Sequence, residues 1–283
     1  MIPLATAFDV FRRNLDPIEA PADAILARYR IREHILSAWQ PSREGVIGSY
    51  RRGTNPRPTR ELDYLFVLDS RHQPYVQADP SRCLDDVMAR VMMAFPKVRA
   101  RKLTRGVGMI YGDFTLTLIP ALARHGGGVF IPDGELRRWL PSDPDAHARF
   151  AQEVDRKANG LAVPVVRALQ LWQRAHAVPV RTFHLEVLAL RALGVAPQSL
   201  LDGCVTALAG VSAGVKARCP SPVPVGDDVD QYLAAKPDLR DKIAAVASDA
   251  VDALQEAVAL DREKQHDAAR ARVHPLFGAA FPT

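Results

Sequence analysis

The chain has 283 residues, enough for one large core or two modest domains, and its 48% hydrophobic and 24% charged residues are ordinary for a globular protein. Its formal net charge of +5 favours anionic ligands, but a surplus this small permits nucleic acid as a partner without requiring it. Cys83, Cys204 and Cys219 are odd in number and lack CxxC spacing, which indicates reduced thiols and excludes a disulfide framework and a zinc site.

The N-terminal stretch MIPLATAFDVFRRNLD carries acids and arginines where a signal peptide needs an apolar core, and no apolar run reaches the roughly 18 residues that span a membrane. We therefore expect a cytoplasmic protein without membrane contact. Residues 6 to 14 predict a short helix. Residues 17 to 40 predict a longer amphipathic helix, because apolar residues recur there at helical spacing until Pro41.

Residues 45 to 68, GVIGSYRRGTNPRPTRELDYLFVL, predict a strand, a Gly-Ser turn, a basic Pro-rich loop and a second strand. The glycine, Gly48, lets a backbone N–H and the Ser49 hydroxyl approach an anion closely. Glu61 and Asp63 lie two apart in the second strand, so alternation places both carboxylates on one face. Adjacent carboxylates repel unless a cation lies between them, and hard oxygen ligands suit Mg²⁺ or Mn²⁺. The predicted ligand is a metal-bound phosphate.

Arginines crowd the loop beside this carboxylate pair, at Arg51, Arg52, Arg57 and Arg60. A basic loop can also serve only to keep a surface solvated, and two acids at strand spacing can be the wet face of an edge strand. We favour contact with phosphate or nucleobase, since guanidinium groups match phosphate oxygens well. Arg51 is the candidate nucleotide-binding residue among the four.

The joint pattern, a hydrophobic-Gly-Ser turn, eleven residues and then an acid-hydrophobic-acid strand, resembles the polymerase-beta-like nucleotidyltransferases. Within them, GSYRRGT followed by ELDYLFVLD is most similar to the cGAS/DncV-like nucleotidyltransferases (CD-NTases) of bacterial antiphage signalling. The resemblance implies an α+β fold: a mixed-sheet catalytic lobe over residues 1–140, long N-terminal helix included, and an all-helical lobe over 141–283 that closes the nucleotide cleft. It also implies Mg²⁺ or Mn²⁺ as cofactor, nucleoside triphosphates as substrates and a downstream effector protein as partner.

The segment after the acid strand predicts further parts of the catalytic lobe. Residues 81 to 95 predict an amphipathic helix whose apolar side chains, Met92 among them, pack into the core. GVGMIYG and DFTLTLIPAL predict two strands joined by a turn at Gly112 and Asp113.

One expected ligand is replaced in the second of these strands. The resemblance places a third metal-binding carboxylate two residues before a hydrophobic-Pro pair, here Ile119 and Pro120, and that position holds Thr117. Asp113 has the right parity but lies four residues away, roughly 13 Å along a strand, too far to share the site. The Thr117 hydroxyl could bind a metal-bound water but supplies no charge.

From Asp143 onward, a predicted helix N-cap, the chain becomes almost wholly helical. The predicted helices run to about residue 158 and then over 163 to 176, 181 to 193, 197 to 216 and 237 to about 271. A mixed α/β half followed by an all-helical half predicts two lobes with a cleft between them.

The helical half also resembles the family in single positions. Gln170, in VVRALQLW, stands where the family usually carries a triphosphate-binding lysine, whereas Thr182, in RTFHLE, keeps the hydroxyl that reaches the triphosphate. His184 and Glu186 are interpreted as orienting this helix start and the contact between lobes, without a catalytic role. We expect six side chains to line one cleft: Ser49, Glu61, Asp63, Thr117, Gln170 and Thr182.

Three functions fit these observations. The first is an enzyme that joins nucleoside triphosphates into a cyclic or linear oligonucleotide second messenger. The second is a catalytically weakened or inactive member that binds a nucleotide or a protein partner, and the third is a template-independent enzyme that adds nucleotides to nucleic-acid ends. The lost charges at Thr117 and Gln170 favour the second. We favour the first, because the Gly-Ser turn and both strand carboxylates survive, which drift after loss of function would not be expected to spare.

Overall fold

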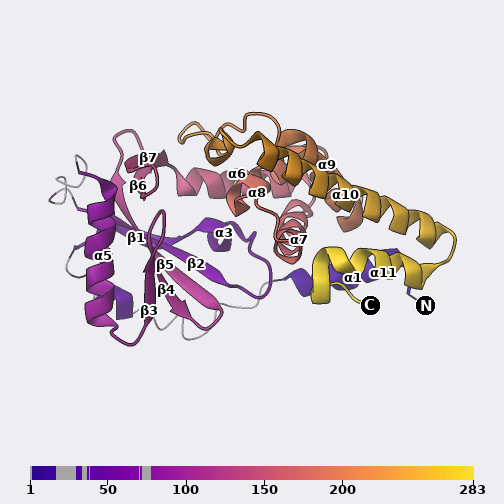
Figure 1. Ribbon diagram of the computed structural model, residues 1–283, viewed down its shortest axis with the longest axis horizontal. Helices are drawn as coiled ribbons and strands as arrows, with labels where there is room; N and C mark the ends of the chain where they lie inside the picture. The colour runs from indigo at the N-terminus through magenta and orange to yellow at the C-terminus, as the bar shows by residue number, and fades with distance from the viewer. Residues whose placement is uncertain (1, 17–29, 34–36, 38, 70, 72–77) are drawn as a thin grey trace.

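The structure is a computed structural model that describes residues 2–16, 30–33, 37, 39–69, 71 and 78–283. Most of the helix predicted over residues 17 to 40 lies outside the described residues. The chain forms a sheet-containing lobe and a helical lobe, as Figure 1 shows, so the predicted α+β architecture is confirmed. Among the described helices, none is both long and apolar enough to cross a membrane.

A seven-stranded mixed sheet forms the first lobe. Its strands lie side by side in the order β1 (Arg43–Ile47), β2 (Glu61–Leu68), β5 (Phe114–Ala123), β4 (Val107–Tyr111) and β3 (Arg99–Lys102), with β6 (Val129–Asp133) beside β5 and β7 (Arg138–Ser142) beside β6. Only β2 and β5 run parallel; the other paired strands are antiparallel. The turn predicted between β4 and β5 is confirmed.

Helix α5 (Pro80–Ala94) covers one face of this sheet and leaves the other face to the helical lobe (Figure 1). Val87 and Val91 of α5 pack with Leu62 and Phe66 of β2 in one core cluster. The predicted helix is therefore confirmed, but the prediction that Met92 packs in the core is wrong. Met92 is 46% exposed, because it projects from the outer side of α5.

The helical lobe contains α6 (Pro144–Lys157), α7 (Ala162–Ala175), α8 (Thr182–Ala192), α9 (Leu200–Gly214), α10 (Pro237–Arg262) and α11 (His266–Phe277). Asp143 caps α6 as predicted, since its side chain accepts a hydrogen bond from the Ala146 N–H. The single helix predicted over 237 to 271 is wrong. Lys264 has a φ of 62°, which ends α10, and α11 packs back against it.

Helix α1 (Leu4–Leu15) begins the chain but packs in the core of the helical lobe. The rings of Phe8 and Phe11 contact Phe281 at centroid distances of 5.1 and 5.4 Å. The Leu4 N–H donates to Asp261 Oδ1 over 2.9 Å. The division at residue 140 assigned this segment to the catalytic lobe; the packing of α1 differs because its aromatic face is complementary to the last residues of the chain.

Candidate active site

Strand pairing brings the predicted metal ligands together at the start of the only parallel pair of described strands. Asp63 on β2 lies opposite Thr117 on β5, and Glu61 lies opposite Thr115. These four side chains share the sheet face that looks toward the helical lobe, whereas Leu62 points to the α5 side. The expected single face for Glu61, Asp63 and Thr117 is therefore what the structure shows.

The Gly-Ser segment forms the first turn of a short helix, α3 (Gly48–Arg52), where a turn and loop were predicted. Gly48 has a φ of 72°, and a Cβ built on it would overlap Asp63 Oδ2 and lie 3.2 Å from Asp63 Cγ. Only glycine lets the backbone approach the carboxylate this closely. The glycine thus couples the α3 start to Asp63.

Alanine at position 48 is expected to displace the Asp63 carboxylate and to weaken Mn²⁺ binding about 10-fold or more, because the added methyl group occupies the carboxylate position. Gly112→Ala is the matched control: Gly112 also has a positive φ, 57°, but has no atom within 4 Å of an added Cβ. Electron paramagnetic resonance titration with Mn²⁺ measures both variants. Equal Mn²⁺ affinities for them would contradict the prediction.

Two connected cavities lie between the lobes. The larger, of about 580 Å³, is lined by Ser49, Glu61, Asp63, Thr117 and Thr182, together with Phe183. The smaller, of about 230 Å³, shares three of these residues and adds Gln170. The six side chains expected in one cleft are thus brought together, divided between the two cavities.

Arg51, the predicted nucleotide contact, is not among the residues that line these cavities. Its guanidinium lies 2.8 Å from Asp145 Oδ1 on α6, in a separate groove beside β1. The prediction is therefore corrected: Arg51 is not placed to contact a nucleotide in the cleft. Arg52 lines the larger cavity instead. In a helix, successive side chains point about 100° apart, and the loop interpretation gave no such direction.

Arg52 also joins the lobes through a buried ion pair with Glu186 of α8. Its Nε and Nη2 donate to the two carboxylate oxygens over 2.6 and 2.9 Å, and the side chains are 9% and 0% exposed. Thr54 Oγ1 donates to the same carboxylate over 3.0 Å. The interpretation of Glu186 as a contact between lobes is thus supported by its partners.

Glu186→Gln is expected to lower the free energy of unfolding by about 3 kcal/mol, because it leaves the Arg52 guanidinium buried without a counter-charge. Glu153→Gln is the control; Glu153 pairs with Lys157 on the surface of α6, with side chains more than half exposed, and such pairs contribute under about 1 kcal/mol. Urea unfolding measures both. The prediction fails if the two substitutions cost the same.

Asp63 is the electrostatically strained member of the carboxylate pair. Burial raises its pKa from 3.8 to about 6, and the negative charge of Glu61 raises it further, while Arg52 and Arg105 oppose the shift. A carboxylate in this state gains from a cation beside it. Within the described part of the chain, no three His, Cys, Asp or Glu side chains converge. The pair therefore fits one divalent metal ion whose remaining ligands come from phosphate oxygens or water.

Sequence reasoning missed Arg105, His147 and Arg174, which line the two cavities. Burial, and then the charge of Arg52, lowers the pKa of His147 to about 4, so its imidazole is neutral at pH 7. Arg105 follows a short loop between β3 and β4 that carried no motif. Arg174 lies one helical turn after Gln170, a spacing that could have found it once the helix was predicted.

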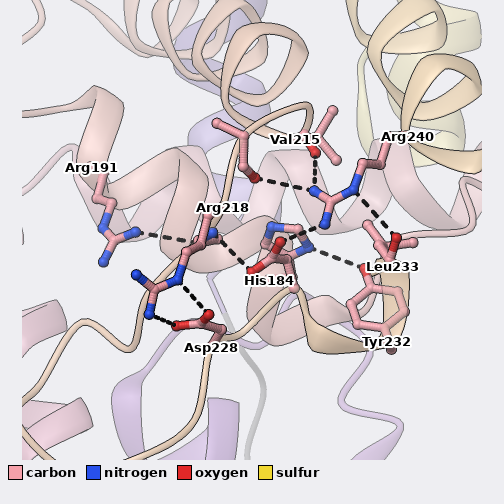
Figure 2. A network of polar contacts seen from close by, with 11 residues as sticks. His184, Arg191, Val215, Arg218, Asp228, Tyr232, Leu233 and Arg240 are labelled. Atoms are coloured by element: carbon pink, nitrogen blue, oxygen red, sulfur yellow. Dashed lines mark hydrogen bonds and ion pairs between the residues drawn. The ribbon is translucent and has the colours of Figure 1, made fainter. Parts of the chain in front are cut away.

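A polar network fixes the segment that positions Thr182, and Figure 2 shows its members between α8 and α10. Arg240 Nη2 donates to Asp230 Oδ2 over 2.5 Å, and Asp230 Oδ1 accepts from the Cys219 N–H over 2.8 Å. The nearby Tyr232 hydroxyl accepts from the Arg181 N–H over 2.8 Å and lies 3.1 Å from His184 Nδ1 (Figure 2). The start of α8 is thereby held in place by the loop that precedes α10.

A mixed sheet carrying this carboxylate pair, closed by a helical lobe across a cleft, defines a polymerase-beta-like nucleotidyltransferase fold. Residues 3–155 match the model of the Second Messenger Oligonucleotide or Dinucleotide Synthetase domain. The chain belongs to the cGAS/DncV-like nucleotidyltransferase (CD-NTase) family of such synthetases.

Relatives and solved structures agree with this assignment. A cyclic AMP-AMP-AMP synthase of Acinetobacter sp. (strain ATCC 27244 / 9458) is 30% identical over 138 residues, which cover 46% of this chain and only 38% of that protein. CdnC of E. coli MS115-1, solved with ATP, superposes with a TM-score of 0.75 at 18% identity, covering 100% of this chain and 99% of that one.

The fold extends to other members of the family. The Bradyrhizobium diazoefficiens CD-NTase CdnG, solved in complex with GTP, gives a TM-score of 0.75 at 12% identity over 98% of this chain and 95% of that one. Vibrio cholerae DncV gives 0.63 at 14% identity over 85% and 69%. The predicted fold is therefore confirmed over nearly the whole chain.

Proposed function

We propose that this protein joins nucleoside triphosphates into a cyclic or linear oligonucleotide second messenger of bacterial antiphage signalling. The observation that carries the proposal is the Glu61 and Asp63 pair, which lies against Gly48 in a cavity between two lobes. Membership of the synthetase family supports the reaction class. The relative that makes cyclic AMP-AMP-AMP supports ATP as the first substrate to test.

Each lining residue has a defined part in binding. A divalent ion, Mg²⁺ or Mn²⁺, held by Glu61 and Asp63 would neutralise charge that develops on the transferring and leaving phosphates. The Ser49 and Thr182 hydroxyls can donate hydrogen bonds to phosphate oxygens from opposite lobes, so they orient the triphosphate across the cleft. Phe183 and Arg52 form the wall behind Thr182, with the guanidinium carbon 5.0 Å from the ring centroid.

A catalytically weakened member that binds nucleotide or a protein partner is the second candidate. The specific observation for it is Thr117, which lies opposite Asp63 and is only 8% exposed, so a neutral hydroxyl occupies the place expected for a third carboxylate. The E. coli MS115-1 CdnC that shares this fold was solved in complex with HORMA-deltaN, which makes a protein partner a reasonable proposal for this chain too.

The purified protein is to be incubated with labelled ATP, GTP, CTP, UTP or dNTPs, with Mg²⁺ or Mn²⁺, and the products separated by chromatography. We expect metal-dependent oligonucleotide products from ATP and their loss in EDTA. Extension of an added RNA or DNA end would instead identify a tailing enzyme. No product from any nucleotide, despite nucleotide binding by calorimetry, would reject the enzyme and retain the weakened binder.

A further inference from the structure

The smaller cavity contains two arginines that face one another from different lobes. Arg60 immediately precedes β2 in the sheet lobe, and Arg174 lies near the end of α7 in the helical lobe. Across the residues that the structure describes, neither guanidinium donates a hydrogen bond or forms an ion pair with a protein group. Burial lowers the pKa of Arg174 and the charge of Arg60 lowers it further, with Glu61 opposing. Two like charges are thus held together with little compensation.

Gln170 adds a neutral donor to the same cavity. Its side chain is 2% exposed, and its Nε2 is buried with no hydrogen-bond partner in the described chain. A buried donor without an acceptor is costly, so a ligand oxygen at this point would be stabilising. The hydroxyls of Ser49 and Thr182 line the same space.

This set of groups selects a polyphosphate anion. Guanidinium forks and amide donors match phosphate oxygens in geometry and charge, and the one carboxylate of the cavity, Glu61, is the proposed metal ligand on its other side. An anion that touches Arg60 and Arg174 together must span the two lobes. A chain of linked phosphates has oxygens along its length and can do so.

We propose that Arg60 and Arg174, with Gln170, bind the polyphosphate tail of a nucleoside triphosphate independently of metal. Its identification as the tail of the substrate rests on the proposed function. Arg174 supplies, from one helical turn further along α7, the positive charge that position 170 lacks. Because the two arginines belong to different lobes, the bound anion also draws the lobes together at this seam.

Isothermal titration calorimetry with sodium tripolyphosphate in EDTA tests this on the full chain. We expect the wild type to bind, and Arg60→Ala and Arg174→Ala each to weaken binding about 10- to 100-fold, the range for hydrogen bonds to charged groups. Arg174→Lys is expected to retain most of the affinity because it keeps the charge. Arg156→Ala, an exposed arginine of α6, is the matched control and is expected to bind like wild type.

The ligand arms separate the possible sources of the anion. ATP in EDTA should bind at least as well as tripolyphosphate and compete with it, whereas orthophosphate should bind more weakly because it cannot reach both arginines. Tripolyphosphate affinity that survives in both alanine variants, or that requires metal in the wild type, would overturn the proposal. If Arg174→Ala does not fold, as judged by circular dichroism, Arg174→Gln replaces it.

The two proposals fail separately. Metal-free tripolyphosphate binding through both arginines, without product from labelled nucleotides, would retain this site and reject the enzymatic function. Product formation with no arginine-dependent binding in EDTA would retain the enzyme and reject this site.

Discussion

Asn in place of Asp63 is expected to abolish the metal-dependent part of nucleotide binding, which we expect to be about 100-fold in affinity, and to remove product formation. Asp63 is one of only two carboxylates that the described chain offers to a metal ion here, and it lies directly against Gly48. Removing its charge leaves Glu61 alone, too few hard ligands for Mg²⁺ or Mn²⁺. Calorimetry of ATP with Mg²⁺ and with EDTA measures the difference.

The same variant should keep its affinity for tripolyphosphate in EDTA, because the arginine site lies in the neighbouring cavity. That measurement is the control for folding. Equal ATP affinities with Mg²⁺ and with EDTA in the wild type would contradict the assignment of Glu61 and Asp63 as metal ligands.

Asp63→Asn should also change stability in a pH-dependent way. The native state holds a proton on Asp63 up to about pH 6, whereas the unfolded chain releases it near 3.8, so this group lowers stability as pH rises through that window. The full effect corresponds to about 3 kcal/mol at 1.36 kcal/mol per pKa unit. Without metal, the variant is therefore expected to be up to about 3 kcal/mol more stable at pH 7 and to converge with wild type near pH 4. Urea unfolding in EDTA at several pH values measures this, and parallel pH profiles would contradict it.

Thr117→Asp is expected to raise the rate of pyrophosphate release about 100-fold, if the missing charge limits the reaction. Its position opposite Asp63 places the new carboxylate in the same cavity and on the same strand face. Electrostatic contacts of this kind contribute a few kcal/mol to the transition state, which converts to such a factor. Thr115→Asp is the control, because Thr115 lies opposite Glu61, two residues from Thr117 along β5.

The outcome also decides between the two leading functions. A robust wild-type rate that falls in Thr117→Asp would reject the weakened member, because the added acid would then disturb a working set of ligands. A silent wild type that is revived would show that charge loss had stopped the chemistry. Gln170→Lys should add little in either case, since Arg60 and Arg174 already provide positive charge in the smaller cavity.

The metal face could be predicted because strand alternation is a local rule. Glu61 and Asp63 share a face by spacing alone, and Thr117 joins them once β2 and β5 are paired. The cleft positions of Gln170 and Thr182 followed from resemblance to the family, and the structure places both in the smaller cavity.

Features that depend on direction or on distant packing were not predictable in this way. Whether Arg51 or Arg52 enters the cleft depends on α3, a helix too short to leave a periodic pattern. The charged strand β3 has no apolar alternation, and it pairs only because β4 offers a partner. Lys264 reverses the chain between α10 and α11 without any glycine or proline to mark the break.

The packing of α1 has a mechanical consequence. Both ends of the chain lie in the helical lobe, where Asn14 Nδ2 donates to the Ala280 carbonyl over 2.9 Å, and Figure 1 shows them together at one extremity. The sheet lobe is therefore an inserted body held at two covalent crossings, one between α1 and β1 and the other between β7 and α6. Fluorophores attached at the two termini would report on one rigid lobe and would be blind to opening of the cleft. A pair that senses opening needs one label on the sheet, for example on the outer side of α5.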